Sequence, residues 1–131
     1  DMFGPVDFVK LIEDDAREMK TNPNCRWKKP EDTHAGALFG GDMSTLKERA
    51  QPYCPPYILT KEMCPMLILH GDCDKLVSCD ISEGFYDEIV KAGMEDRADL
   101  YILHGAGHGT KEFFQQETKE IIRAFFDKNL K

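Results

Sequence analysis

Two short segments of the chain combine acidic, histidine and glycine residues, and each directly follows an apolar run. Residues 70–77 (HGDCDKLV) follow the run that begins at Pro65, and residues 104–109 (HGAGHG) follow the run at 98–103. If both runs are strands of a parallel sheet, the two segments emerge at the same edge, where such sheets place their ligands. An aspartate of the first segment can then fix the tautomer of a histidine in the second, which leaves one ring nitrogen free to deprotonate a nucleophile.

The same residues allow other uses. The side chains of Asp72, Asp74, His104 and His108 are also of types that bind metal ions, but an acid–histidine pair explains them better, and we predict no metal site. Asp72 is the rival acid, and we expect it to support the turn. His70 and His104 stand at the ends of the apolar runs, where we expect structural roles. The glycines around His108 let the backbone turn sharply beside a substrate.

The elements that must position these segments alternate between strand and helix. Residues 65–70 predict a strand that is buried on both faces, and residues 98–104 predict a second strand. Between them, apolar residues recur at helical spacing from Ile81 to Val90, and Gly93 is a natural C-terminal stop. A last helix is expected to begin near Thr110, with a broad apolar face formed by Phe114, Ile121, Ile122, Phe125 and Phe126. Such alternation predicts right-handed crossovers and a parallel sheet.

The first 62 residues predict helices and loops instead. Residues 3–5 (FGP) are typical of a strand end that turns into a loop. Asp7 can cap a helix that runs to about Lys20. Shorter helices are expected near residues 31–38 and 44–50, and a proline-rich connection follows at 51–56. The aromatic residues Trp27, Tyr53 and Tyr57 could line a substrate pocket, although burial at the base of a lid is the simpler interpretation.

The composition excludes several classes of protein. With 131 residues, 41% hydrophobic and 31% charged, the chain has the composition of one globular domain. A net charge of −7 and a pI of about 5.0 argue against a nucleic-acid partner. No apolar run approaches the ~20 residues of a membrane span, so no membrane partner is expected. Five irregularly spaced cysteines favour free thiols and a cytoplasmic rather than a secreted protein.

Taken together, the motifs resemble the C-terminal half of the α/β-hydrolases, close to the feruloyl- and acetyl-esterase-like members and their prolyl-oligopeptidase-type relatives. The matching segments are residues 3–7 (FGPVD), 65–77 (PMLILHGDCDKLV) and 92–109. The resemblance implies that Asp74, the aspartate before x-x-Val, is the acid of a catalytic triad and that His108 is its histidine. It implies no cofactor.

The fold class implied is α/β. The whole chain, 1–131, is expected to be a single partial α/β-hydrolase domain with about three mainly parallel strands and flanking helices. Residues 5–62 would form a helical, cap-like insertion, and residues 63–131 a strand–helix–strand–helix segment that carries the acid and histidine loops.

The chain departs from the family in lacking its nucleophile. The family places a serine in G-x-S-x-G before the acid, whereas Ser44, Ser78 and Ser82 stand in other settings. Cys73 resembles the cysteine elbow of dienelactone hydrolases, but that motif requires glycine where this chain has Lys75. We therefore expect part of a serine esterase that is inactive alone and that associates with itself or with the missing N-terminal half.

The resemblance leaves the substrate and the rival functions open. The parent enzyme would act on a small ester or an acylated carbohydrate, including those of plant cell walls. One alternative is a fragment of a prolyl-oligopeptidase-type peptidase, because the residues that separate ester from peptide substrates are not legible in this sequence. The other is a non-catalytic domain that forms assemblies through an unpaired strand edge.

Overall fold

The structure, a computed structural model, describes residues 1–130 and divides the chain into two compact units. One unit comprises Asp1–Gly4 and the chain from Leu59 onward, and it contains both loops with candidate site residues. The other unit comprises Pro5–Ile58.

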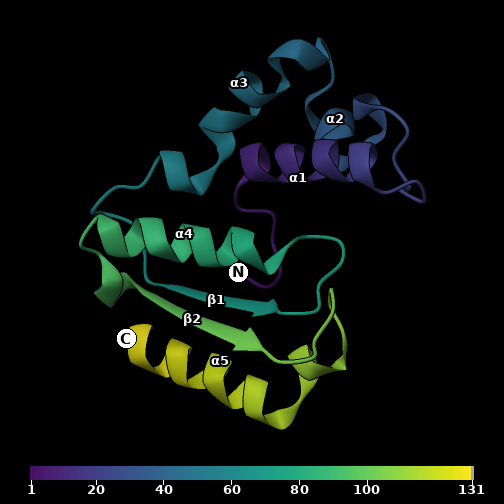
Figure 1. The fold of residues 1–131 in the computed structure, drawn as a ribbon. Helices are drawn as coiled ribbons and strands as arrows, with labels where there is room; N and C mark the ends of the chain where they lie inside the picture. Colours follow the sequence, from purple (N-terminus) through teal and green to yellow (C-terminus); the bar gives the residue numbers. More distant parts are fainter. Residues whose placement is uncertain (131) are drawn as a thin grey trace. The chain divides into compact units, whose positions relative to one another are not determined.

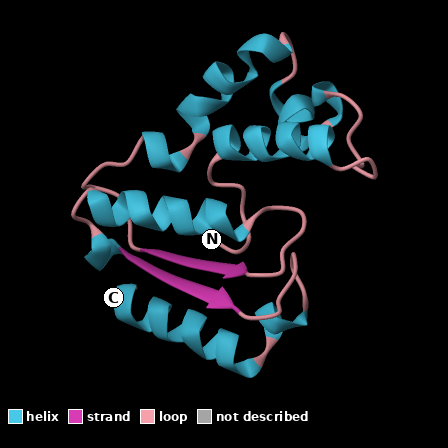
Figure 2. Cartoon of the chain, viewed as in Figure 1, coloured by secondary structure: helices cyan, strands magenta, loops and turns pink. Residues whose placement is uncertain are grey.

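The first unit is built on two parallel strands, β1 (Met66–Gly71) and β2 (Ala98–Leu103), paired in register from Met66 opposite Ala98. Figures 1 and 2 show helix α4 (Cys79–Lys91) along one face of this sheet and helix α5 (Gln116–Asn129) along the other. The strand–helix–strand–helix order and the parallel pairing are therefore as the apolar runs predict.

Each face of β1 meets a different helix because side chains alternate along a strand. Leu67 and Leu69 are buried in a cluster with Phe113, against which Ile121, Ile122 and Phe125 pack. His70 points to the opposite face and is hydrogen-bonded to Ser82 of α4. This arrangement holds the end of β1 between two layers and fixes the loop that follows it.

The third strand expected at the start of the chain is present only as an isolated parallel bridge between Met2 and Leu69. The N–H of Phe3 donates to the Leu69 carbonyl at 2.8 Å, and the N–H of Leu69 donates to the Asp1 carbonyl at 3.0 Å. Within residues 1–130 the sheet thus has two strands rather than about three. The backbone bends at Phe3, directly after the bridge residue Met2, so the extended pairing does not continue into a strand of ordinary length.

The last helix also differs from the prediction. Thr110 precedes a short 3₁₀ helix, Lys111–Phe114, and α5 begins only at Gln116 because Gln115 is extended (φ −68°, ψ 162°). The extra turn changes which aromatic side chain faces the core. Phe113 is buried, while Phe114, expected on the inner face, is 58% exposed.

The second unit contains helices α1 (Phe8–Thr21), α2 (His34–Phe39) and α3 (Leu46–Ala50). Its remaining helical turns are short 3₁₀ helices, Pro30–Asp32, Met43–Thr45, Gln51–Tyr53 and Pro55–Tyr57. The predicted cap is present, since an oxygen of Asp7 accepts a hydrogen bond from the N–H of Lys10 at 3.0 Å. The rings of Trp27 and His34 are in edge contact, and Tyr53 and Tyr57 are exposed. No helix in the described part of the chain is long and apolar enough to cross a membrane.

Candidate active site

The two loops meet where the parallel strands end side by side. The N–H of Asp72 donates to the Leu103 carbonyl at 3.3 Å, and the N–H of Cys73 donates to the Ala106 carbonyl at 2.9 Å. Gly71 permits this approach, because a Cβ at that position would collide with the Ala106 carbonyl group, whose carbon would lie at 2.7 Å. A glycine at the end of β1 is therefore a condition for joining the loops.

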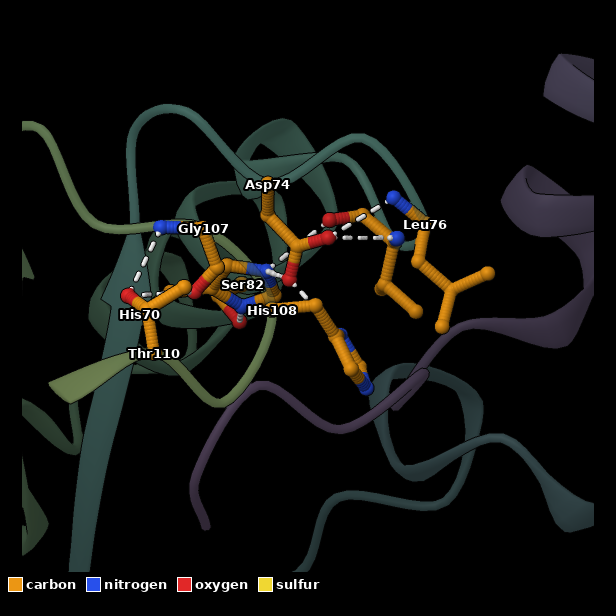
Figure 3. Close-up of polar contacts among 8 residues, drawn as sticks. His70, Asp74, Leu76, Ser82, Gly107, His108 and Thr110 are labelled. Atoms are coloured by element: carbon orange, nitrogen blue, oxygen red, sulfur yellow. Dashed lines mark hydrogen bonds and ion pairs between the residues drawn. The ribbon is translucent and has the colours of Figure 1, made fainter.

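Asp74 lies in the first loop. Its carboxylate is buried, and both of its oxygens accept hydrogen bonds. Its Oδ1 accepts hydrogen bonds from the N–H groups of Leu76 at 2.8 Å and Val77 at 3.0 Å. Its Oδ2 lies 2.8 Å from Nδ1 of His108, a residue of the second loop (Figure 3). The structure thus brings together the two residues that the sequence predicts as acid and base.

The surroundings of Asp74 keep it ionised. Burial tends to raise the pKa of this carboxyl group, but the N–H donors of Val77 and Leu76 and the ring of His108 together outweigh it, so the pKa of Asp74 is lowered. A carboxylate that stays charged accepts the Nδ1 proton of His108 and stabilises the ring when it becomes protonated.

His108 is oriented by its neighbours and remains accessible. Its side chain is 33% exposed, and the ring of Phe3 contacts it edge-on with centroids 4.7 Å apart. Gly109 follows with a positive φ of 62°, which turns the loop directly after the histidine. Among residues 1–130, no hydrogen-bond partner is present for Nε2. That nitrogen is therefore free to exchange a proton with a substrate or a nucleophile.

Asp72 and His104 form a separate pair. His104 Nδ1 lies 2.9 Å from Asp72 Oδ2, and the N–H of Gly105 donates to Asp72 Oδ1 at 2.7 Å. The bond from His104 and that from Gly105 lower the pKa of Asp72. The His104 side chain is 88% exposed, so this pair ties the two loops at the surface and leaves Asp74 to His108.

The cysteines near the site are unfavourable nucleophiles. The hydrogen bond and the charge of Asp72 raise the pKa of the Cys73 thiol. Burial and nearby carboxylates raise the pKa of Cys79 to about 11. A thiol reacts as its thiolate, which these surroundings suppress. All five cysteines, Cys25, Cys54, Cys64, Cys73 and Cys79, are free thiols.

Two other chemistries find little support in the described residues. No three His, Cys, Asp or Glu side chains of residues 1–130 are grouped so that they could hold a metal ion. No hydrogen bond joins a serine of this range to His108. Ser82 is bonded to His70, and Ser78 precedes α4 without a side-chain cap.

Sequence reasoning missed two residues that touch the site. Phe3 packs on His108 from a backbone with a φ of 47°, the one positive φ among non-glycine residues of the described chain. The sequence marks Phe3 as a strand end but does not place it beside His108, because that place depends on its pairing with Leu69. His70, expected to be structural, is fully buried and lies 3.3 Å from the carboxylate of Asp74. In the sequence, the position of His70 four residues before Asp74 is the signal that could have indicated this contact.

The comparison with known protein families supports the esterase resemblance. No curated protein sequence matches the chain. Among solved structures, the esterase PE8 is similar, with 30% sequence identity over 50% of this chain and a TM-score of 0.41. The match spans 28% of the length of that esterase. The profile of the BD-FAE family matches residues 1–89, more than half of the chain, including Asp74. The chain belongs to the BD-FAE family, a family of esterase-like α/β-hydrolases.

Proposed function

We propose that this chain supplies the acid and the histidine of a Ser–His–Asp triad that hydrolyses carboxylic esters. The observation that carries the proposal is the 2.8 Å contact between the buried Asp74 carboxylate and Nδ1 of His108, with Nε2 left unbonded in the described chain. A carboxylate and an imidazole in this arrangement form the acid–base part of a serine hydrolase.

The proposed reaction assigns one role to each residue. His108 takes the proton of a serine hydroxyl through Nε2 while the serine oxygen bonds to the ester carbonyl carbon. The carbon–oxygen bond to the alcohol then breaks, and His108 gives the proton to the departing alcohol. Water repeats the sequence on the acyl-serine, which releases the acid and restores the hydroxyl. Asp74 keeps the Nδ1 proton in place throughout.

In this proposal the serine and the oxyanion-hole donors come from polypeptide outside these 131 residues. The substrate we propose is a small ester or an acylated carbohydrate, with acyl esters of plant-cell-wall sugars as the class to test first. Membership of the esterase-like BD-FAE family supports an ester as the substrate.

The test is ester hydrolysis by the protein encoded by an upstream-extended reading frame, with p-nitrophenyl acetate as the probe. Asp74→Asn and His108→Ala should each lower kcat on the order of 10⁴-fold, because they remove the orienting acid and the base. Asp72→Asn and His104→Ala are matched controls from the surface pair and should leave kcat within a few-fold. Loss of activity in the His104→Ala protein with activity retained in the His108→Ala protein would overturn the assignment.

We also propose that the face near the start of the chain contacts further polypeptide, either a second copy or the segment that carries the nucleophile. A hollow of about 420 Å³ lies there and is mainly apolar, lined by Met2, Met66, Leu67, Leu69, Ile122, Phe125 and others. In the described chain, the edge of β1 away from β2 is paired only through the isolated bridge at Met2. A strand edge left largely unpaired can pair with another chain, which supports an association at this place.

A further inference from the structure

A continuous path of hydrogen bonds leads from helix α4 to the candidate base. Ser82 Oγ lies 2.6 Å from Nδ1 of His70, and Nε2 of His70 lies 3.0 Å from the Val77 carbonyl oxygen. The N–H of Val77 then donates to Asp74 Oδ1 at 3.0 Å, and Asp74 Oδ2 accepts from His108 Nδ1 at 2.8 Å. Figure 3 shows His70, Ser82, Asp74 and His108 gathered in this network.

The direction of these bonds follows from the groups involved. A carbonyl oxygen only accepts, so Nε2 of His70 must carry the proton that it shares with Val77. Nδ1 of His70 is then unprotonated in the neutral ring and accepts the Ser82 hydroxyl proton. His70 and Ser82 are both fully buried, so water cannot replace either bond.

This arrangement gives His70 more than a packing role. By holding the Val77 carbonyl, it closes the 74–77 turn from one side, while Asp74 Oδ1 closes the same turn from the other. Nε2 of His70 also lies 3.3 Å from Asp74 Oδ2, the oxygen that faces His108. The orientation of Asp74 thus depends on a ring that is itself fixed by Ser82.

We infer that His70 and Ser82 are positioning residues for the Asp74–His108 pair, an inference that rests on the proposed function for its catalytic meaning. Together they keep Asp74 Oδ2 directed at Nδ1 of His108 and so hold the His108 proton on that nitrogen. An apolar residue at position 70 would fill the space but would leave the Val77 carbonyl without its donor.

The test is the tautomer of His108, read from ring ¹⁵N and ¹H NMR signals of the chain labelled at histidine. In the unchanged chain, His108 should show a protonated Nδ1 and an unprotonated Nε2. Ser82→Ala should move the two nitrogen signals toward a common average and weaken the Nδ1–H resonance. Ser78→Ala makes the same atomic change at the start of the same helix, outside the network, and should leave the His108 signals unchanged.

Position 70 supplies the second comparison. His70→Gln keeps an N–H near the place of Nε2 and should largely preserve the His108 tautomer, whereas His70→Leu should lose it. Unchanged His108 signals in the Ser82→Ala protein would overturn the inference, and that variant decides alone if His70→Leu does not fold. Because the measurement needs no nucleophile, it can fail while the proposed function holds, and a lack of ester hydrolysis can refute the function while this inference stands.

Discussion

Oδ2 of Asp74 lies 2.8 Å from Nδ1 of His108, although the two residues are 34 positions apart and both belong to loops. Two parallel strands that end together account for this meeting, and Gly71 allows the loops to touch. The acid is buried and the histidine is partly exposed. In such an arrangement the acid orients the histidine from within the protein, and the histidine can reach a bound group.

Asp74→Asn should make the free energy of unfolding depend less on pH in the acidic range. Since the folded state holds the pKa of Asp74 below its ordinary value, the charged carboxylate contributes stability that is complete above that ordinary value. The contribution is lost as the pH falls through the lowered pKa. Urea unfolding at about pH 6 and about pH 3 should therefore show a smaller pH-dependent loss in the variant than in the unchanged chain. The same change at the exposed Asp87 of α4 is the control and should leave the pH dependence intact.

Gly71→Ala should destabilise the chain by about 1–3 kcal/mol, because the new Cβ collides with the Ala106 carbonyl group. Gly84→Ala is the matched control inside α4, where a Cβ would meet no atom within 4 Å. That substitution should stabilise by about 0.5–1 kcal/mol through helix propensity. Urea unfolding of both proteins measures the difference, and equal stability of the two would contradict the close approach of the loops.

The 131-residue chain by itself should hydrolyse p-nitrophenyl acetate no faster than a mock preparation. The serines of residues 1–130 make no hydrogen bond to His108, and the charge of Asp72 suppresses the Cys73 thiolate. Cys73→Ala should accordingly leave the background rate of p-nitrophenyl acetate hydrolysis unchanged. Turnover well above background that disappears in the Cys73→Ala protein would instead establish the cysteine as the nucleophile.

Sedimentation should detect association of the chain. The apolar hollow near Met2 and the half-exposed Phe126 would otherwise face water, at about 25 cal/mol per Å² of apolar surface. Analytical ultracentrifugation at micromolar concentration should give a dimer or larger species, and Phe126→Glu should shift it toward monomer. If the unchanged chain and the variant are both monomers that melt cooperatively, this apolar surface is stable in water without a partner.

The sequence predicts the strands and the acid–histidine pair because both depend on local signals. Apolar runs that stop at Gly71 and near Gly105 mark the strand ends, and parallel strands place the following loops together. The start of α5 at Gln116 escaped prediction, since Thr110 looks like a cap and nothing local reveals the extended Gln115. The one-residue bridge at Met2 and the contact of Phe3 with His108 depend on partners far along the chain, which no local pattern encodes.

The ring of Phe3 covers His108 only after the chain has closed a long loop. The N–H of Phe3 is hydrogen-bonded to the carbonyl of Leu69, and the main-chain nitrogen of Asp1 is hydrogen-bonded to the carbonyl of Leu67, 66 residues away. In the sequence, the whole helical unit lies between these partners. The β1–α4–β2–α5 segment, by contrast, joins neighbours in sequence. Loop-closure entropy and contact order therefore favour a folding order in which the Asp74–His108 pair assembles early. The aromatic contact on His108 should form in a later, slower kinetic phase.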